Sequence, residues 1–436
     1  MARLVFILDH EEGHLLSTMK LARQLVERGH SVHYLGLAEG ADLVRRHGFE
    51  FTPILEDVLP KGSAVAIQNE MAHLMQSPRW ASAAAKGEEL ALNPGLRYLH
   101  HLVRGDDFDR TLRGLRPDLL LITNHHLVHV LALHYRFRLP MVMLNPSLRT
   151  FPRSRYPEAL QGLLLEAGLA AEPLFDLVRK IAPAARRFSE ITAPILTFRE
   201  LSLYPADFDL PQAEPEVETF YIEASVDLDR PEEGDFPWER LDPTRRLVFA
   251  SVGSQSRLLG HEKVVRFLRA VTEAAASRPD WQLVLSTGNL VDPAEIPAPA
   301  GSVVVRWAPQ MALLRHAAVM ITHSGMGTVK ECIFLGVPMA AFPMMRDQPD
   351  VAERIVYHRL GVRGDFETAT AEQIAALVDQ VDQDETIRAN VARMRQRFLE
   401  VEESGIGVQR IEEVLNGEVS RQAYPPTWRG LQNQPA

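Results

Sequence analysis

The sequence predicts an α/β protein built from two facing, doubly wound parallel-sheet domains, and three observations support this fold class. Short uninterrupted apolar runs, typical of strands buried on both faces of a parallel sheet, alternate with amphipathic helical patterns in both halves of the chain. The length of 436 residues exceeds what one hydrophobic core usually organises. A stretch rich in proline and acidic residues separates the two series.

The first series starts with an apolar run at residues 4–8, which we expect to be a buried strand. Apolar residues then recur at helical spacing from 15 to 28, with residues 9–14 as a loop before them. A strand at 31–37 and a short helix at 41–47 continue the β-α order. Further strands are expected at 118–123, 140–144, 195–197 and 201–204.

The second series begins with a strand at 247–251 and a helix at 261–276. We therefore expect an N-terminal domain at 1–215, a solvated linker at 216–242 and a C-terminal domain at 243–400. In the C-terminal domain, further strands are expected at 282–286, 303–306, 319–322 and 339–342.

Composition excludes several classes of protein. The net charge of −10 disfavours a nucleic-acid or anionic-membrane surface, since both need basic clusters. The single cysteine, Cys332, excludes an internal disulfide and lies on an apolar helix face, where we expect a buried side chain. No window has the length and apolarity of a membrane-spanning helix. These features predict a cytoplasmic protein without a membrane span or nucleic-acid partner.

The densest chemistry in the chain lies between residues 319 and 331. An apolar run at 319–322 ends in a glycine-rich turn that opens a helical pattern. Such a turn frees backbone N–H groups, and the helix N-terminus adds a partial positive charge, so the segment suits an anion such as a phosphate. The turn consists of His323, Ser324, Gly325, Met326, Gly327 and Thr328.

Other residues near this turn suit the remaining parts of a nucleotide sugar. Trp307 follows a predicted strand, where an indole can stack on a nucleobase. Glu331 lies one helical turn beyond the loop, where a carboxylate can accept hydrogen bonds from two ribose hydroxyls. Asp347 and Gln348 also follow a predicted strand, and a carboxylate beside an amide suits the vicinal hydroxyls of a sugar.

Residues 307–354 thus contain W-A-P-Q, H-S-G-M-G-T-V-K-E, G-V-P and P-M-M-R-D-Q in this order. The pattern resembles the nucleotide-sugar site of the family-1 glycosyltransferases, which include plant secondary-metabolite, glucuronosyl and bacterial macrolide enzymes. The resemblance implies the GT-B fold, with two facing Rossmann-like domains. It also implies that residues 401–436 form a helix that packs back on the N-terminal domain, followed by a tail.

The resemblance implies a role for each matching position. Trp307 would stack on the base, with Gln310 near the base or ribose, and Glu331 would hold the ribose hydroxyls. Asp347 and Gln348 would hold the sugar. Val351 departs from the family, which usually has asparagine there. The diphosphate would be held by Gly253, Ser254, His323, Ser324, Gly325, Gly327 and Thr328.

The segment Glu12-Gly13-His14 resembles the G-H signature of the same family, whose histidine is the general base. An imidazole with a pKa near ~6.5 suits removal of a proton from an acceptor hydroxyl. Many relatives orient this histidine with an aspartate after the strand that corresponds to 118–123. Thr123 and Asn124 stand at that place, so we expect Asn124 to fix the tautomer of His14.

Two patterns suggest metal sites, and both are better explained without a metal. The D-x-D tripeptides at 107–109, 207–209 and 227–229 resemble manganese motifs of another glycosyltransferase class, but none follows a convincing strand of the nucleotide-binding half. His125 and His129 form an i, i+4 pair within a group that includes His126 and His134. No glutamate lies between the pair to act as a base, so a helix facing the cleft is favoured over zinc.

We therefore predict an inverting, metal-independent transfer of a sugar from a nucleoside-diphosphate donor to a hydroxyl of an apolar small-molecule natural product. UDP-glucose is the leading donor and a dTDP-sugar is second, and no other cofactor is expected. Two alternatives remain open: a non-catalytic, nucleotide-sugar-binding activator or partner of the same fold, and a sugar-nucleotide epimerase. The identity of the acceptor and the oligomeric state are not predicted.

Overall fold

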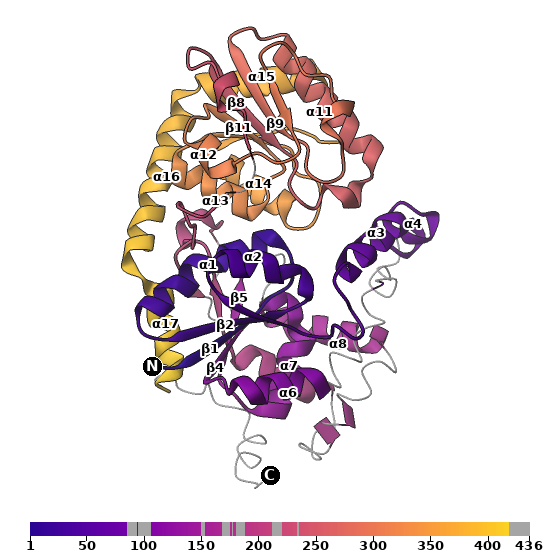
Figure 1. Ribbon diagram of the computed structural model, residues 1–436, viewed down its shortest axis with the longest axis vertical. Helices are drawn as coiled ribbons and strands as arrows, with labels where there is room; N and C mark the ends of the chain where they lie inside the picture. The colour runs from indigo at the N-terminus through magenta and orange to yellow at the C-terminus, as the bar shows by residue number, and fades with distance from the viewer. Residues whose placement is uncertain are drawn as a thin grey trace. The chain divides into compact units, whose positions relative to one another are not determined.

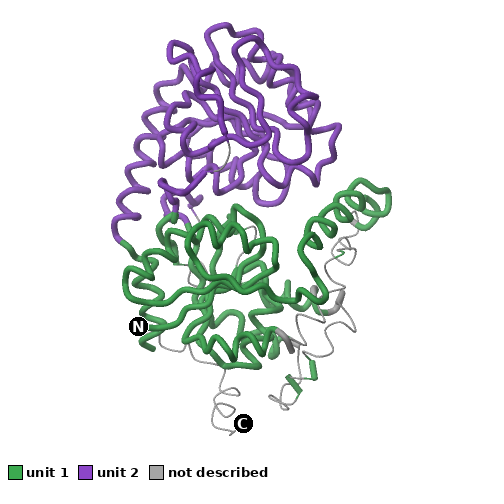
Figure 2. Tube along the Cα trace, viewed as in Figure 1, with its two compact units in different colours: residues 1–203, 212–225, 405–436 green, residues 204–211, 226–404 purple. Residues whose placement is uncertain are grey.

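The structure is a computed structural model, and the chain folds into two compact units (Figures 1 and 2). Unit 1 contains Met1–Leu203, Gln212–Ser225 and Gly405–Ala436, and unit 2 contains Tyr204–Pro211 and Val226–Ser404. Each unit has one sheet in which every neighbouring pair of strands is parallel. The structure describes residues 1–84, 94, 106–149, 153–167, 175–176, 178–179, 188–211, 220–232 and 235–417.

The sheet of unit 1 has the order β3-β2-β1-β4-β5-β6-β7. The strand order reverses between β1 and β4, and the carboxyl ends of strands at such a reversal form a crevice that commonly binds ligands. The uninterrupted apolar runs account for the central strands, which are buried on both faces. The strands are β1 (Arg3–Ile7), β2 (Ser31–Gly36), β3 (Glu50–Pro53), β4 (Leu119–Thr123), β5 (Met141–Asn145), β6 (Arg199–Ser202) and β7 (Phe220–Tyr221).

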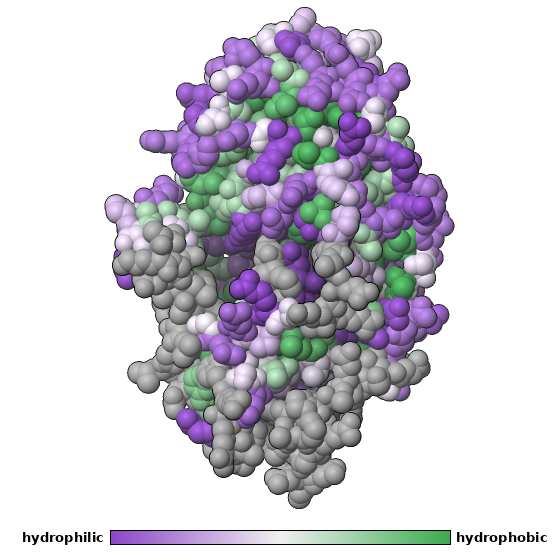
Figure 3. All heavy atoms as spheres, turned by 180° about the vertical axis from the view of Figure 1, so that it is seen from behind, coloured by the Kyte–Doolittle hydropathy of each residue, from purple (hydrophilic) through white to green (hydrophobic). Residues whose placement is uncertain are grey.

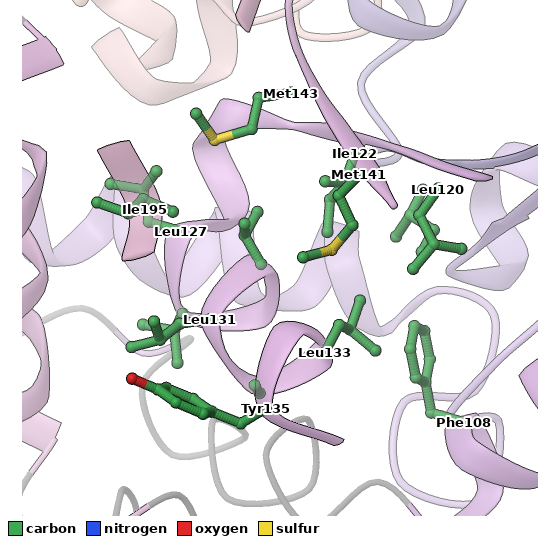
Figure 4. Close-up of a cluster of buried hydrophobic side chains, with 14 of the residues drawn as sticks. Phe108, Leu120, Ile122, Leu127, Leu131, Leu133, Tyr135, Met141, Met143 and Ile195 are labelled. Carbon is green, nitrogen blue, oxygen red and sulfur yellow. The ribbon is translucent and has the colours of Figure 1, made fainter. Parts of the chain in front are cut away.

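Helices cover both faces of this sheet, and successive residues of each strand contribute to opposite cores. Leu4 and Phe6 pack with α1 and α17 on one face, whereas Val5 and Ile7 belong to the cluster on the other face. In that second cluster, side chains of β4, β5 and α7 pack together (Figure 4). The helices are α1 (Glu12–Glu27), α2 (Ala41–Arg46), α3 (Ser63–Met75), α4 (Pro78–Ala84), α6 (Asp106–Leu115), α7 (Leu127–Phe137), α8 (Tyr156–Ala167), α10 (Phe188–Thr192) and α17 (Ile406–Leu415).

The sheet of unit 2 has the order β10-β9-β8-β11-β12-β13, with the reversal between β8 and β11. Its strands are β8 (Arg246–Ser251), β9 (Trp281–Ser286), β10 (Val303–Val305), β11 (Val319–Thr322), β12 (Met339–Ala341) and β13 (Gly361–Arg363). Its helices are α11 (His261–Ala276), α12 (Gln310–Leu314), α13 (Met326–Leu335), α14 (Gln348–Tyr357), α15 (Ala371–Gln383) and α16 (Glu385–Ser404). The predicted fold class, two parallel-sheet α/β domains, is confirmed.

Three local predictions differ from the structure. Helix α1 begins at Glu12, so His14 lies in its first turn and not in a loop. Residues Ala193–Thr197 form a 3₁₀ helix with proline near its start, not a strand. Strands β3 and β13 were not predicted, because both are short and carry no long apolar run.

The segment expected to be a solvated linker, 216–242, is instead divided between the two units. Ile222 is fully buried in unit 1, and the Glu223 carboxylate accepts a hydrogen bond of 2.8 Å from the backbone N–H of Gly407. In unit 2, Glu232 accepts hydrogen bonds of 2.6 and 3.0 Å from the N–H groups of Met311 and Ala312. Carboxylates of this acidic segment therefore bind helix N-termini in unit 1 and in unit 2.

Helix α17 packs in the core of unit 1 through Val408 and Ile411. Its Glu412 side chain accepts hydrogen bonds from Arg28 and contacts His30, which joins it to the end of α1. The tail predicted beyond this helix, residues 418–436, lies outside the described residues.

The surface and the single cysteine agree with ordinary burial rules. On the face in Figure 3, hydrophilic side chains cover most of the described surface of unit 2, with smaller apolar groups among them. None of the described helices is both long enough and apolar enough to cross a membrane. Cys332 is fully buried, and burial raises the pKa of its thiol well above the usual value, so this group is unsuited to be a nucleophile.

We expect Gly361→Ala to destabilise unit 2. A Cβ at this position would lie 1.9 Å from the carbonyl oxygen of Met339, its partner residue across β12 and β13. Since the obstacle is backbone, the strands must move apart, and the free energy of unfolding should fall by about 1–3 kcal/mol in urea denaturation. Gly114→Ala is the control, because a Cβ there meets no atom within 4 Å. Equal stability of both variants would contradict the prediction.

Candidate functional site

The first cluster of functional side chains in unit 1 lies at the reversal point of its sheet. Asp9 follows β1, His14 lies in the first turn of α1, and His125 belongs to a 3₁₀ turn, Asn124–His126, that follows β4. Because β1 and β4 are parallel neighbours, their carboxyl ends bring these three side chains together.

The carboxylate of Asp9 is the centre of this cluster. His14 Nδ1 lies 2.8 Å from both carboxylate oxygens, and His125 Nδ1 lies 3.3 Å from Oδ2. The backbone N–H of Glu11 donates to Oδ1 at 3.1 Å. His125 Nε2 lies 3.0 Å from Ser147 Oγ, after β5, and the two imidazole rings are 4.8 Å apart at their centroids.

Electrostatics keep Asp9 ionised. Burial alone would raise the pKa of this carboxyl, but the positive potential of His14 and hydrogen bonds from both imidazoles bring its pKa well below the usual value. An ionised carboxylate only accepts hydrogen bonds, so both imidazoles donate from Nδ1. In neutral His14 the lone pair is therefore on Nε2, which is the tautomer that a general base requires.

Asn124, the residue predicted to orient His14, contacts a different part of unit 1. Its side-chain N–H donates to the hydroxyl of Tyr156 at 3.2 Å, and that hydroxyl donates to Glu200 at 3.1 Å. Glu200 is fully buried and pairs with Arg149 and Arg153. The prediction for Asn124 is therefore corrected, because the partner of His14 is Asp9. Asp9 follows β1, whereas the orienting residue was expected after the neighbouring strand β4.

His125 and His129, the i, i+4 pair of this region, have different surroundings. His125 contacts Asp9, whereas His129 is buried and its ring stacks on Phe108 at 6.1 Å. Burial lowers the pKa of His126 to about 4 and that of His129 to about 3, so both rings are neutral at physiological pH. They extend the packing around the site and add no charge to it.

The second cluster lies at the reversal point of unit 2, after β8 and β11. The ring of His323 is held between two glycines: a Cβ on Gly253 or on Gly325 would lie 2.4 Å from it. Gly253 has a φ of +71°, and Ser324 takes the left-handed conformation at +65°, which is unusual for a residue with a side chain. Its N–H donates to Thr322 Oγ1 at 3.0 Å.

This turn presents unsatisfied polar atoms at the start of α13. Among the described residues, His323 Nδ1 and Ser324 Oγ are buried without a hydrogen-bond partner. Such atoms are costly unless something else bonds them, so they indicate a ligand. Burial lowers the pKa of His323 to about 4, although its hydrogen bond with the Ser251 carbonyl opposes this shift. His323 is therefore a neutral hydrogen-bonding group at physiological pH.

Gly327 and Ser254 border the same turn. A Cβ on Gly327 would meet no protein atom within 4 Å, so the protein itself does not require glycine there. Ser254 follows Gly253 and is half-buried. Thr328 Oγ1 accepts a hydrogen bond of 3.3 Å from Gln310, which links the turn to α12.

Glu331 is engaged by two side chains within unit 2. One carboxylate oxygen accepts a hydrogen bond from Arg230 and the other from Gln310. Arg230 and Glu331 are only 11% and 8% exposed, so the ion pair is nearly desolvated. Arg230 belongs to the segment predicted as linker, and no sequence pattern connects it with Glu331. Trp307, nearby in the chain, remains 46% exposed, as a stacking platform must be.

Asp347 and Gln348 lie at the start of α14, after β12. Gln348 is 4% exposed, and its side-chain oxygen accepts hydrogen bonds from the N–H groups of Met344 and Met345 at 3.0 and 3.1 Å. Its NH₂ group is thus the part of the amide left to bond the sugar that the sequence prediction assigned to it. Asp347 is half-buried, and its carboxylate does not cap its own helix.

Comparison with known proteins identifies similar glycosyltransferases. The family model described as UDP-glucoronosyl and UDP-glucosyl transferase matches residues 238–398. The oleandomycin glycosyltransferase of Streptomyces antibioticus is 28% identical over 88% of this chain and 85% of its own length. The glycosyltransferase YjiC of Bacillus subtilis is 24% identical over 95% and 96%.

Solved structures agree on the fold. The kitacinnamycin glycosyltransferase superimposes with a TM-score of 0.71 and 24% identity, covering 95% of this chain and 99% of the other. The calicheamicin glycosyltransferase CalG4 superimposes with a TM-score of 0.65 and 20% identity, covering 96% and 99%. Fold and sequence similarity together define a glycosyltransferase with the GT-B fold. Residues 238–398 thus match a family-1 glycosyltransferase domain, and the chain is similar to bacterial glycosyltransferases of natural-product type that use nucleotide-sugar donors.

We expect Gly327→Ala to separate stability from nucleotide binding. Alanine is favoured over glycine by about 1 kcal/mol within a helix, and no protein atom opposes the new methyl group, so the thermal midpoint should stay constant or rise. Affinity for a nucleoside diphosphate, measured by calorimetry, should fall at least about tenfold because the methyl group keeps the diphosphate from the N–H groups of the turn. Unchanged affinity would show that the diphosphate does not approach this residue.

Proposed function

We propose that this enzyme transfers a sugar, with inversion at the anomeric carbon, from a nucleoside-diphosphate donor to a hydroxyl of an apolar small-molecule natural product. The observation that carries the proposal is the pair Asp9–His14: a buried, ionised carboxylate that accepts a hydrogen bond from His14 Nδ1. This contact sets the tautomer in which Nε2 takes the proton of an attacking hydroxyl.

The chemistry is a single displacement in which the acceptor oxygen attacks as the diphosphate leaves. His14 Nε2 accepts the hydroxyl proton, and Asp9 stabilises the imidazolium that forms. Stabilisation of the leaving diphosphate is assigned to unit 2, through the N-terminus of α13, the hydroxyl of Ser324 and the neutral ring of His323. No metal ion is needed for these steps, since fixed N–H and O–H donors supply the stabilisation.

The acceptor is assigned to unit 1, next to α3. Gln68 of α3 lies 3.2 Å from His10, which is in the same loop as Asp9, so this helix borders the base. Ile67, Met71 and Leu74 of α3 are only partly buried, which leaves apolar surface along the helix. Partly exposed aliphatic and thioether groups beside a base suit a hydroxyl carried on an apolar skeleton.

The Asp9–His14 pair also bears on the two alternatives. A non-catalytic nucleotide-sugar-binding partner was attractive because the orienting aspartate was absent from its usual position. Asp9 supplies an equivalent carboxylate from β1, so this argument for an inactive protein no longer holds. An epimerase would need no acceptor base oriented in this way, and no observation favours it.

For the donor, the contacts of Glu331 favour a 2′-deoxyribose nucleotide, such as a dTDP-sugar, over UDP-glucose. Arg230 and Gln310 already occupy one acceptor position on each carboxylate oxygen. Two acceptor positions remain on this nearly desolvated carboxylate; a ribose would need both for its hydroxyls, whereas a deoxyribose needs only one. A spinosyn rhamnosyltransferase of the same fold, with a TM-score of 0.63 and 16% identity, binds thymidine diphosphate.

We expect Asp9→Asn to lower kcat about 10²- to 10⁴-fold, because an amide can donate to His14 Nδ1 and stabilise the wrong tautomer. His14→Ala should abolish transfer. Asn124→Ala is the matched control and should change kcat far less, since Asn124 contacts Tyr156 and not the imidazole. Rates of glycoside formation are measured by mass spectrometry, and nucleotide affinity by calorimetry should be the same in all three variants. A larger loss in Asn124→Ala than in Asp9→Asn would refute the assignment.

We expect Arg230→Met to relax the choice of nucleotide. Removing the cation frees acceptor positions on Glu331, so kcat/KM for a UDP-sugar relative to the matching dTDP-sugar should rise at least about tenfold. Arg278→Met, which removes a surface pair with Asp379, is the control. An equal loss with both donors would instead assign Arg230 to the diphosphate or to stability of the fold.

A further inference from the structure

The cluster around Asp9 is also a set of metal-ligating atoms. One oxygen of Asp9 and one ring nitrogen each of His14 and His125 all lie within 4.8 Å of one another. The separation of 3.3 Å between Asp9 Oδ2 and His125 Nδ1 is close to the edge of a tetrahedron with metal–ligand bonds of about 2.0–2.1 Å. Two imidazoles and one carboxylate leave a fourth position open.

The charges of the cluster favour a cation. Among the described residues, Asp9 forms no ion pair with a lysine or an arginine; its partners are the two imidazoles and one backbone N–H. Glu11 brings a second carboxylate, with Oε2 at 3.8 Å from His14 Nδ1. The side chains of Asp9, Glu11 and His14 are 14–15% exposed, so water screens the negative charge of Asp9 only weakly.

We propose that Asp9, His14 and His125 bind a divalent transition-metal ion of the zinc class, and that the bound ion switches the enzyme off. Imidazole nitrogen with carboxylate oxygen is the ligand chemistry of Zn²⁺, and three protein ligands with an open position suit it. His125 is 39% exposed, which gives an ion access from solvent. The proposed metal binding does not depend on the proposed function. The proposed inhibition does, because it rests on the role of His14 as the base.

The inhibition follows from the tautomer of His14. Both imidazoles present Nδ1 to Asp9, so a metal ion there takes the Nδ1 lone pair and the ring proton moves to Nε2. His14 Nε2 then carries a hydrogen and no longer accepts a proton from an acceptor hydroxyl. At His125, Nε2–H donates to Ser147 Oγ, a contact that a hydroxyl permits in either direction.

The test measures metal binding directly on the full, untagged chain. Co²⁺ titration should give visible absorption bands of a low-coordinate site, and Zn²⁺ should displace Co²⁺. Asp9→Ala and His125→Ala should each weaken Zn²⁺ binding at least about tenfold. His261→Ala is the matched control, because it removes a histidine that pairs with a carboxylate, Glu295, on the surface of unit 2. Its Zn²⁺ affinity should equal that of the unaltered chain.

Activity is then compared as the ratio of transfer rates with and without Zn²⁺. This ratio should fall well below one for the unaltered chain and for His261→Ala, and stay near one for His125→Ala. Circular dichroism melting checks each variant, and His125→Gln replaces His125→Ala if the latter unfolds. Unchanged Zn²⁺ affinity in folded Asp9→Ala and His125 variants would overturn the site. Zn²⁺ binding that needs these residues, in a chain without transferase activity, would instead overturn the proposed function.

Discussion

The buried carboxylate of Asp9 is the contact on which the chemistry of unit 1 depends. It accepts hydrogen bonds from two imidazoles that come from different segments, one after β1 and one after β4. A charge with so little exposure is stable only when donors surround it, so the two rings and the carboxylate hold one another in place. The orientation of His14 and the negative potential beside it therefore have a single origin, and any cation that enters must compete with protons for the same nitrogens.

Unit 2 also holds a buried imidazole at the end of a strand, but other residues surround it. There the ring of His323 is wedged between Gly253 and Gly325, and burial keeps it neutral. A neutral ring has one N–H to donate, so most of the positive potential available to a diphosphate must come from the start of α13 and its backbone. Arg230, a cation close to Glu331, is bound to that carboxylate. The Arg230–Glu331 ion pair thus lies at the residue proposed to hold the nucleoside, whereas backbone dipoles are proposed to bind the phosphates.

The sequence was sufficient to predict the parallel strands, the two α/β units and the grouping of functional residues at strand ends. It was insufficient where a contact joins segments that share no pattern. Arg230 and Glu331 are 101 residues apart, and the proline- and acid-rich surroundings of Arg230 indicate a solvated linker. Asp9 was detectable in principle, since it directly follows a strand and precedes His14 by five residues. It was missed because the family pattern directs attention to the end of the neighbouring strand, where Thr123 and Asn124 stand.

The sheet explains why the orienting carboxylate can follow β1 instead of β4. β1 and β4 are adjacent and in register from Leu4 with Leu119 to Ile7 with Ile122, so a carboxylate after either strand reaches the start of α1. Moving the acidic residue from one strand end to the other preserves the hydrogen bond to Nδ1 and vacates the position after β4. In this chain His125 stands near that position and bonds the same carboxylate. His14 is therefore oriented by a carboxylate that follows β1, and the additional imidazole of His125 turns this pair of residues into a set with the ligands of a metal site.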